Sequence, residues 1–355
     1  MGLTATQRSI VSKAQTVGGG GQGIALDDAT CVYLVGIIAK DLSHLEQFPE
    51  LPGQLPEFFG TQPLESLRVE GVPFLALFER IVGIDANADM YFACLSALHK
   101  HRLKYERILK TQAIPTIDEV GPRGLLQYGS VDVKALAPFL LWRKWIFNID
   151  NRAAQETGYL FEPIIANAIG GTPASAGRSP VKRVADRTKG RQVDCLRDKK
   201  AHEIKLRVTM AASGQGRWGE ELEFPADCEA SGFTPVLVVL DPTPNDKLDE
   251  LSKRFREKKG EVYIGQEAWN YLTALAGSTM SVFLERYVHQ PLQELLKEMP
   301  TRTDQLPDLT LRLSSQEFAA TIAGHTLIVN RSTRLTDEEH RNEMPEDADD
   351  AIPGP

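Results

Sequence analysis

The chain has 355 residues, 42% of them hydrophobic, which is enough for a substantial core in one elaborated domain or several. Its formal net charge of −8 argues against a protein that coats nucleic acid over its whole surface. No run approaches the roughly 20 apolar residues of a membrane span, and the N-terminus lacks the long apolar stretch of a signal peptide. We therefore expect no membrane segment and a cytoplasmic location.

The four cysteines are far apart in the sequence and form no CxxC pair. This spacing indicates neither a zinc ribbon nor a disulfide framework. We expect all four to be buried thiols.

The first part of the chain, residues 1–150, is predicted to be mainly helical. A flexible arm ending in VGGGGQG comes first, since no GK[ST] follows these glycines as a phosphate loop would require. Asp27 or Asp28 can cap a buried helix over CVYLVGIIAKDL. Further helices are predicted over VPFLALFERIVG, over residues 86–110, where apolar residues recur at helical spacing, and over ALAPFLLWRKWIFNI.

Helix and strand signals alternate from residue 151 onwards. ETGYLFEPIIANAIGG predicts a helix closed by two glycines, TPASAGRSP a loop, and VKRVA a short strand. After the runs QVDCL and HEIKLRV come a helix near EELEFPADCEA, a buried strand TPVLVVLDP, an amphipathic helix NDKLDELSKRFREKKG and a strand EVYIG. This order predicts an α/β (α+β) fold with a mixed central sheet flanked by helices on both faces.

The C-terminal part adds a helix over GSTMSVFLERYVHQPLQELLKEM and two or three strands over LTLRLSSQEFAATIAGHTLIVNR. Residues 337–350 then carry eight carboxylates with little apolar content, which is typical of a disordered tail. We therefore divide the chain into residues 1–150, 151–330 and 331–355.

The stretch from Arg191 to Thr209, RQVDCLRDKKAHEIKLRVT, predicts a β-hairpin that carries chemistry. Side chains alternate between the two faces of a strand, so Glu203, Lys205 and Arg207 share one face of HEIKLRV. A tight turn in LRDKKAH would bring the Asp194 carboxylate beside that of Glu203 across the ladder. Two carboxylates and a lysine would then converge.

Acid-x-Lys triplets are common, and this chain has rivals at Asp132-Val133-Lys134, Asp198-Lys199-Lys200 and Glu257-Lys258-Lys259. The first is better explained by an aspartate that caps the following helix, the second falls in the turn itself, and the third would place its acid and lysine on different faces of a helix. For Glu203 and Lys205 the alternative is a salt-bridge ladder on an edge strand. The surrounding order of elements favours the catalytic interpretation.

Asp194 followed by Glu203-Ile204-Lys205, within this order of helices and strands, resembles the PD-(D/E)xK nuclease core over roughly residues 156–266. Val193 stands where the motif has proline. The resemblance implies a type II restriction endonuclease, a homodimer that cuts both strands of duplex DNA at a short sequence. Overall, the chain resembles the ApaLI-like group of these enzymes, and residues 1–150 would clamp DNA, form dimer contacts or both.

The resemblance also implies a Mg²⁺ site. Mg²⁺ prefers octahedral oxygen coordination with few protein ligands, which Asp194, Glu203 and the backbone carbonyl of Ile204 can supply. Lys205 would polarise the attacking water or neutralise charge on the phosphate. Glu162, in the preceding helix, resembles the additional acid that many such enzymes use.

The hairpin lies in the only strongly basic window of the chain. Residues 178–217 hold twelve Lys and Arg against four acids, a local net charge of +8. Lys and Arg contacts to phosphates dominate affinity for DNA, although a solvated charged face is the alternative. The residues expected to contact DNA are Arg178, Lys182, Arg183, Arg207, Gln215 and Arg217.

Two other functions stay open at this point. One is a repair or junction-resolving nuclease of the same fold, and the other is a DNA-binding module with an inactive site. The first would cut according to DNA structure, and the second would not cut at all.

Overall fold

The computed structural model describes residues 2–17, 23–121, 124, 126, 132–206, 215–298 and 306–331, with the backbone alone at 152–159 and 215–217. The predicted acidic tail after residue 331, the glycines 18–21 and Arg207 lie outside these residues. So do the side chains of Gln215 and Arg217.

The N-terminal part is helical, as predicted. Its elements are α1 (Ala5–Gln15), α2 (Asp28–Asp41), η1 (Leu45–Gln47), η2 (Leu64–Ser66), α3 (Phe74–Ile84), α4 (Ala88–Thr111) and η3 (Ile117–Glu119). Asp27 caps α2 by accepting a hydrogen bond from the backbone N–H of Thr30 at 2.8 Å. The prediction of a flexible N-terminal arm was wrong for Ala5–Gln15, which form α1. A capping box at Thr4 begins this helix, and its Ile10, Val11 and Ala14 are buried.

A single long helix, α6 (Val133–Ala168), follows where two helices were predicted. It contains 36 residues and passes through residue 150, so the two predicted regions share it. No proline stands between Pro138 and Pro163 to end the helix in the middle. It closes at Gly170, whose φ of 69° suits glycine, as the sequence predicted.

The central sheet has five strands in the order β1-β2-β3-β4-β5. They are β1 (Thr172–Ala174), β2 (Val193–Arg197), β3 (Lys200–Lys205), β4 (Thr234–Val239) and β5 (Glu261–Ile264). Strand β2 pairs antiparallel with β1 and β3, whereas β4 pairs parallel with β3 and β5, so the sheet is mixed. The strand predicted over VKRVA was wrong: that segment forms one isolated bridge, between Lys182 and Gly190, and the first strand lies earlier, in the predicted loop.

Helices cover both faces of this sheet, as predicted. Helices α7 (Gln215–Ala230) and α8 (Asp246–Glu257) cover one face, with Phe224 and Phe255 packed on Ala201 and Leu237. The other face packs on α6 and α9 (Gln266–Leu284) through residues such as Ile204. The mixed α and β architecture expected from the sequence is therefore confirmed.

The C-terminal helices begin earlier than predicted. Helix α9 starts at Gln266 and contains a non-helical residue, Gly277 (φ 72°, ψ −176°), where the sequence predicted the helix to start. A π-helical turn, η4 (Glu285–His289), and α10 (Gln290–Glu298) continue it. The buried carboxylate of Asp41 accepts hydrogen bonds from Tyr91 at 2.8 Å and Tyr287 at 2.6 Å, so it joins α2, α4 and η4.

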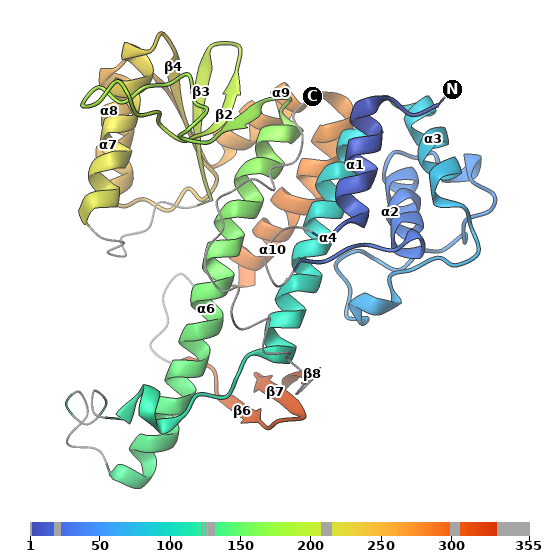
Figure 1. Cartoon of the computed structure of the whole chain (residues 1–355), viewed down its shortest axis with the longest axis vertical. Coiled ribbons are helices and arrows are strands. Elements are labelled where there is room, and N and C mark those ends of the chain that lie inside the picture. The colour runs from blue at the N-terminus through green and yellow to red at the C-terminus, as the bar shows by residue number, and fades with distance from the viewer. Residues whose placement is uncertain are drawn as a thin grey trace.

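The last three strands form a separate antiparallel sheet of β6 (Leu309–Leu313), β7 (Glu317–Ile322) and β8 (His325–Asn330). Phe318 and Val329 pack against Ile108 of α4 and Trp145 of α6. Figure 1 shows this sheet beside the lower half of α6 and the five-stranded sheet at its upper end. Helix α6 is thus the element that connects the two sheets.

All four cysteines are buried and free, as expected. Among the described residues, no helix is long and apolar enough to cross a membrane.

The fully buried Leu34 of α2 offers a test of the helical core. We predict that Leu34→Ala lowers the free energy of unfolding by about 2–5 kcal/mol, because the lost contacts leave a cavity. Leu75→Ala, at a position that is 51% exposed on α3, should change it by less than about 0.5 kcal/mol. Urea denaturation measures both, and equal effects would contradict this packing.

Candidate active site

Asp194 on β2 is tied to the backbone of β3. Its Oδ2 accepts a hydrogen bond from the N–H of Ile204 at 2.7 Å, and the residue is only 8% exposed. The regular pairing of β2 with β3 runs from Arg197↔Lys200 to Cys195↔His202, so this side-chain bond lies just beyond the ladder. Asp194 thereby continues the strand pairing with its carboxylate.

Glu203 and Lys205 share one face of β3, as the alternation predicted. The Lys205 ammonium lies 3.0 Å from Oε1 of Glu203 and 3.4 Å from Oε1 of Glu221 on α7. Burial alone would lower the pKa of Lys205, but the Glu203 and Glu221 carboxylates outweigh it and raise that pKa above its ordinary value. Lys205 is therefore a fixed ammonium.

The carboxylates of Glu203 and Glu162 lie within electrostatic reach of Asp194. Burial raises its pKa well above the ordinary value, and the neighbouring charges of Glu203 and Glu162 raise it further. Glu162 comes from α6, Asp194 from β2 and Glu203 from β3. The structure therefore brings together the four residues for which the sequence predicted a catalytic role.

The donor set fits a hard divalent cation. The repulsion that raises the pKa of Asp194 is relieved when a cation binds among these carboxylates. The N–H and C=O of one strand residue point to the same side, so the carbonyl of Ile204 faces the Asp194 edge, as its N–H does. Within the described chain, however, no three His, Cys, Asp or Glu side chains are already spaced to hold a metal.

His202 belongs to the opposite face, as predicted. Its ring contacts the carbonyl of Cys195 at 3.1 Å and the hydroxyl of Tyr271 at 2.8 Å. Burial lowers the pKa of His202 to about 4, so the ring is neutral near pH 7. Its place is in the packing between the sheet and α9.

Helix α7 anchors the basic segment that precedes the hairpin. The buried carboxylate of Asp227 accepts from Nε of Arg191 at 2.7 Å and from the backbone N–H of Val184 at 2.6 Å. The hydroxyl of Ser231 accepts from the N–H of Lys182 at 2.9 Å. The segment before Asp194 is therefore held beside the same helix that supplies Glu221.

The charge of the basic window is partly compensated by acids from later in the chain. Arg183 pairs with Glu220 at 2.9 Å, and Lys200 pairs with Glu261 at 2.7 Å. Ion pairs that are open to solvent, such as that of Arg183, contribute little to stability. Of the predicted DNA contacts with described side chains, Arg178, Lys182 and Arg183 all lie on the segment held by α7.

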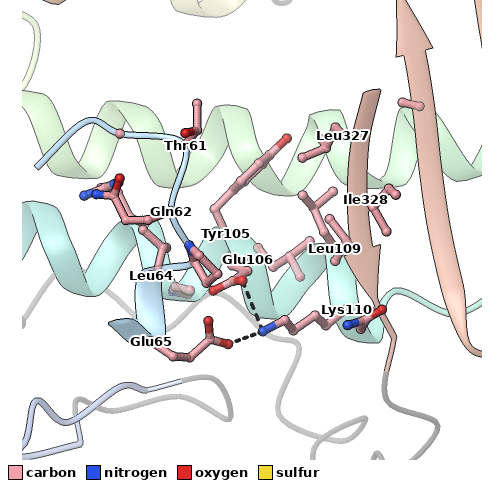
Figure 2. Close-up of a pocket in the computed structure, with 18 of the residues that line it drawn as sticks. Thr61, Gln62, Leu64, Glu65, Tyr105, Glu106, Leu109, Lys110, Leu327 and Ile328 are labelled. Atoms are coloured by element: carbon pink, nitrogen blue, oxygen red, sulfur yellow. Dashed lines mark hydrogen bonds and ion pairs between the residues drawn. The ribbon is translucent and has the colours of Figure 1, made fainter. Parts of the chain in front are cut away.

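A separate groove of about 1040 Å³ lies between α4, residues 60–65 and β8. Figure 2 shows Tyr105, Leu327 and Ile328 around it, with Lys110 paired to Glu65 at 2.6 Å and to Glu106 at 3.1 Å. The carboxylates of the hairpin are not among its lining residues. The candidate site is therefore not in this groove.

Comparison with known proteins identifies the family. The sequence model of the ApaLI-like restriction endonuclease family matches residues 74–289. The chain is also 48% identical to the type II restriction enzyme ApaLI of Acetobacter pasteurianus over 261 residues, which cover 70% of each protein. The chain belongs to the ApaLI-like restriction endonuclease family. No solved structure matched it.

This membership confirms the resemblance read from the hairpin and extends it. The matched residues begin at α3 and end at the π-helical turn η4, so they include α3 and α4 as well as the sheet. The N-terminal helices, which the resemblance to the nuclease core had left out, are therefore partly a property of the ApaLI-like family.

The rival triplets do not form sites in this family member. Asp132 caps α6 by accepting from the N–H of Lys134 at 2.7 Å, as predicted. Asp198 and Lys199 form the hairpin turn with φ values of 46° and 60°. Glu257 ends α8.

Among the described residues, Glu221 contacts Lys205 and was missed by sequence reasoning. It follows Lys205 by 16 positions, and nothing local distinguishes it from Glu220, Glu223 or Glu229 on the same helix. Only the packing of α7 on the sheet selects it. A helical wheel anchored on the buried Phe224 and Cys228 would have narrowed the choice.

The Asp194 environment predicts a stability change. The folded chain without metal binds a proton at Asp194 more tightly than the unfolded chain does, so ionisation destabilises the fold increasingly as pH rises above about 4. Asp194→Asn should therefore raise the melting temperature at pH 8 with a chelator present, and less so at pH 4. Asp198→Asn, at a turn carboxylate that is 82% exposed, is the control. A lower melting temperature for Asp194→Asn at pH 8 would contradict the account.

The Asp227 anchor predicts a stability loss. Asp227→Ala leaves the buried Arg191 guanidinium without its main partner and should lower the free energy of unfolding by about 3–5 kcal/mol. Glu229→Ala on the same helix removes an exposed pair with Lys258 and should cost about 0–1 kcal/mol. Denaturant titration distinguishes them, and a mild effect of Asp227→Ala would show that α7 is held otherwise.

Proposed function

We propose that this chain is a type II restriction endonuclease that hydrolyses phosphodiester bonds in both strands of duplex DNA at a short sequence. The observation that carries the proposal is the convergence of Asp194, Glu203 and Glu162 with the ammonium of Lys205, in a member of the ApaLI-like family. Phosphodiester hydrolysis needs an activated water and compensation of charge on the phosphate. A carboxylate cluster beside a fixed ammonium suits both needs.

The cofactor we propose is Mg²⁺, held by Asp194, Glu203 and the carbonyl of Ile204. When bound, such an ion lowers the pKa of a coordinated water and neutralises phosphate charge. The chain's own part is to present the oxygens, with Asp194 held by the Ile204 N–H. Glu162 contributes further negative charge to the same place.

In this proposal Lys205 stabilises negative charge electrostatically and does not act as a base. Because its pKa is raised, it keeps its proton at the pH where nucleases work. A positive ammonium is complementary to the negative charge that develops on the phosphate. Its place 3.0 Å from Glu203 puts it beside the cation that Glu203 would bind.

The partner is duplex DNA, contacted by the segment that carries Arg178, Lys182 and Arg183. The other expected contacts are Arg207, Gln215 and Arg217, whose side chains lie outside the described residues. A homodimer matches a palindromic site by its twofold symmetry. The division at residues 150 and 330, the roles of the first region in clamping or dimerisation, and the cytoplasmic location stay predictions.

Removing the lysine tests the catalytic role. Lys205→Gln should slow cleavage in Mg²⁺ by about 100- to 1,000-fold, because the transition-state charge loses its partner. Lys199→Gln, in the exposed hairpin turn, should leave the rate within twofold. Single-turnover cleavage of a labelled duplex measures both. Equal rates for the two variants would assign Lys205 to structure alone.

The function itself is tested by digesting long duplex DNA with the wild-type protein and Mg²⁺. Discrete fragments of reproducible size are expected, and Asp194→Ala should abolish them while duplex binding persists. Cleavage confined to branched or damaged DNA would favour a repair or junction enzyme. A protein that binds duplexes but cuts none with Mg²⁺ or Mn²⁺ would be a binding module.

A further inference from the structure

Lys205 is held by two carboxylates that come from different elements. Glu203 precedes it by two residues on β3, whereas Glu221 reaches it from α7 across the face of the sheet. The side chains of Lys205, Glu203 and Glu221 are 18%, 17% and 29% exposed. The pair with Glu221 is thus more sheltered than the ordinary surface pair of Glu229 with Lys258, whose side chains are 44% and 43% exposed.

A divalent cation at Glu203 would change the surroundings of Lys205. The cation competes with the ammonium for the Glu203 carboxylate and repels it at the same time. If Glu203 were its only partner, the ammonium would be driven away from the site when the metal arrives. A second carboxylate beyond the metal's reach removes that difficulty.

Glu221 is suited to be that second carboxylate. Glu203 and Glu162 lie within electrostatic reach of Asp194, whose carboxylate is tied to Ile204. Glu221 instead approaches from the α7 side, where the helix is packed on the sheet through Phe224 and Cys228. Its backbone is fixed further by the Asp227 anchor to Arg191. The helix therefore presents Glu221 from a rigid position.

We propose that Glu221 is a positioning residue, which keeps the Lys205 ammonium in the site when Glu203 takes up the metal. The proposal rests on the proposed nuclease function and on Lys205 as its cationic group. Glu221 itself touches neither metal nor phosphate in this scheme. Because it acts through Lys205, its loss affects the chemical step rather than the binding of DNA or metal.

The test compares Glu221→Gln and Glu221→Asp with Glu229→Gln, which removes a carboxylate elsewhere on α7. Each full-length variant is assayed for single-turnover cleavage rate, for the Mg²⁺ concentration that gives half the maximal rate, and for duplex affinity without divalent metal by fluorescence anisotropy. Melting temperatures establish that each variant is folded. The wild-type protein must first cut duplex DNA into discrete fragments. Failure at that step would reject the proposed function and would be distinguished from failure of the role proposed for Glu221.

We expect Glu221→Gln to slow cleavage by about 10- to 100-fold, the usual effect of removing a group that orients an active residue. Its half-maximal Mg²⁺ concentration should stay within twofold. Its metal-free duplex affinity should be equal or higher, because one negative charge near the phosphates is gone. Glu221→Asp should recover part of the rate, and Glu229→Gln should match wild type.

Three results would overturn the proposal. A rate for Glu221→Gln equal to that of Glu229→Gln would make the contact a structural pair only. A rise in the half-maximal Mg²⁺ concentration of tenfold or more would make Glu221 a metal ligand instead. Weaker metal-free binding of the duplex would place its role in holding DNA.

Discussion

The hydrogen bond from the Ile204 N–H to the Asp194 carboxylate is the contact on which the rest of the site depends. It places an acid in the ladder position beyond Cys195↔His202. Without it, a carboxylate beside two others would turn towards water. With it, the acids stay close enough to repel one another, and a bound cation would relieve that repulsion.

That arrangement opposes stability, as active sites often do. Burial and neighbouring charges disfavour the ionised form of Asp194, so the chain without metal must offset that cost elsewhere. It does so with ordinary means: a large apolar core shared by α2, α4, α6 and the sheet, and the buried pair of Arg191 with Asp227. Asp227 of this pair lies on α7, the helix that also supplies Glu221.

Much of this could be predicted from sequence because the signals are local. Strand alternation placed Glu203 and Lys205 on one face, and capping logic assigned Asp132 to its helix. What failed depends on distant contacts. The segment VKRVA, which was expected to be a strand, instead donates backbone hydrogen bonds to Asp227 and Ser231, more than forty residues later. Glu221 was not predicted either, since the packing of α7 on the sheet decides which of its glutamates reaches Lys205.

The basic window shows the same limit. Its local charge of +8 counts residues that pair with Glu220, Asp227 and Glu261, all of which lie outside the window in the sequence. Charge along a sequence is therefore a guide to the region of the site and not to the individual contacts.

The most direct measurement is cleavage of long duplex DNA in Mg²⁺ by the wild-type protein and by Asp194→Asn at equal concentration. The account predicts discrete fragments from the wild type and none from Asp194→Asn, although that variant is folded and binds the duplex. Fragments produced equally by both proteins would contradict it, because the acid held by Ile204 would then have no part in the chemistry.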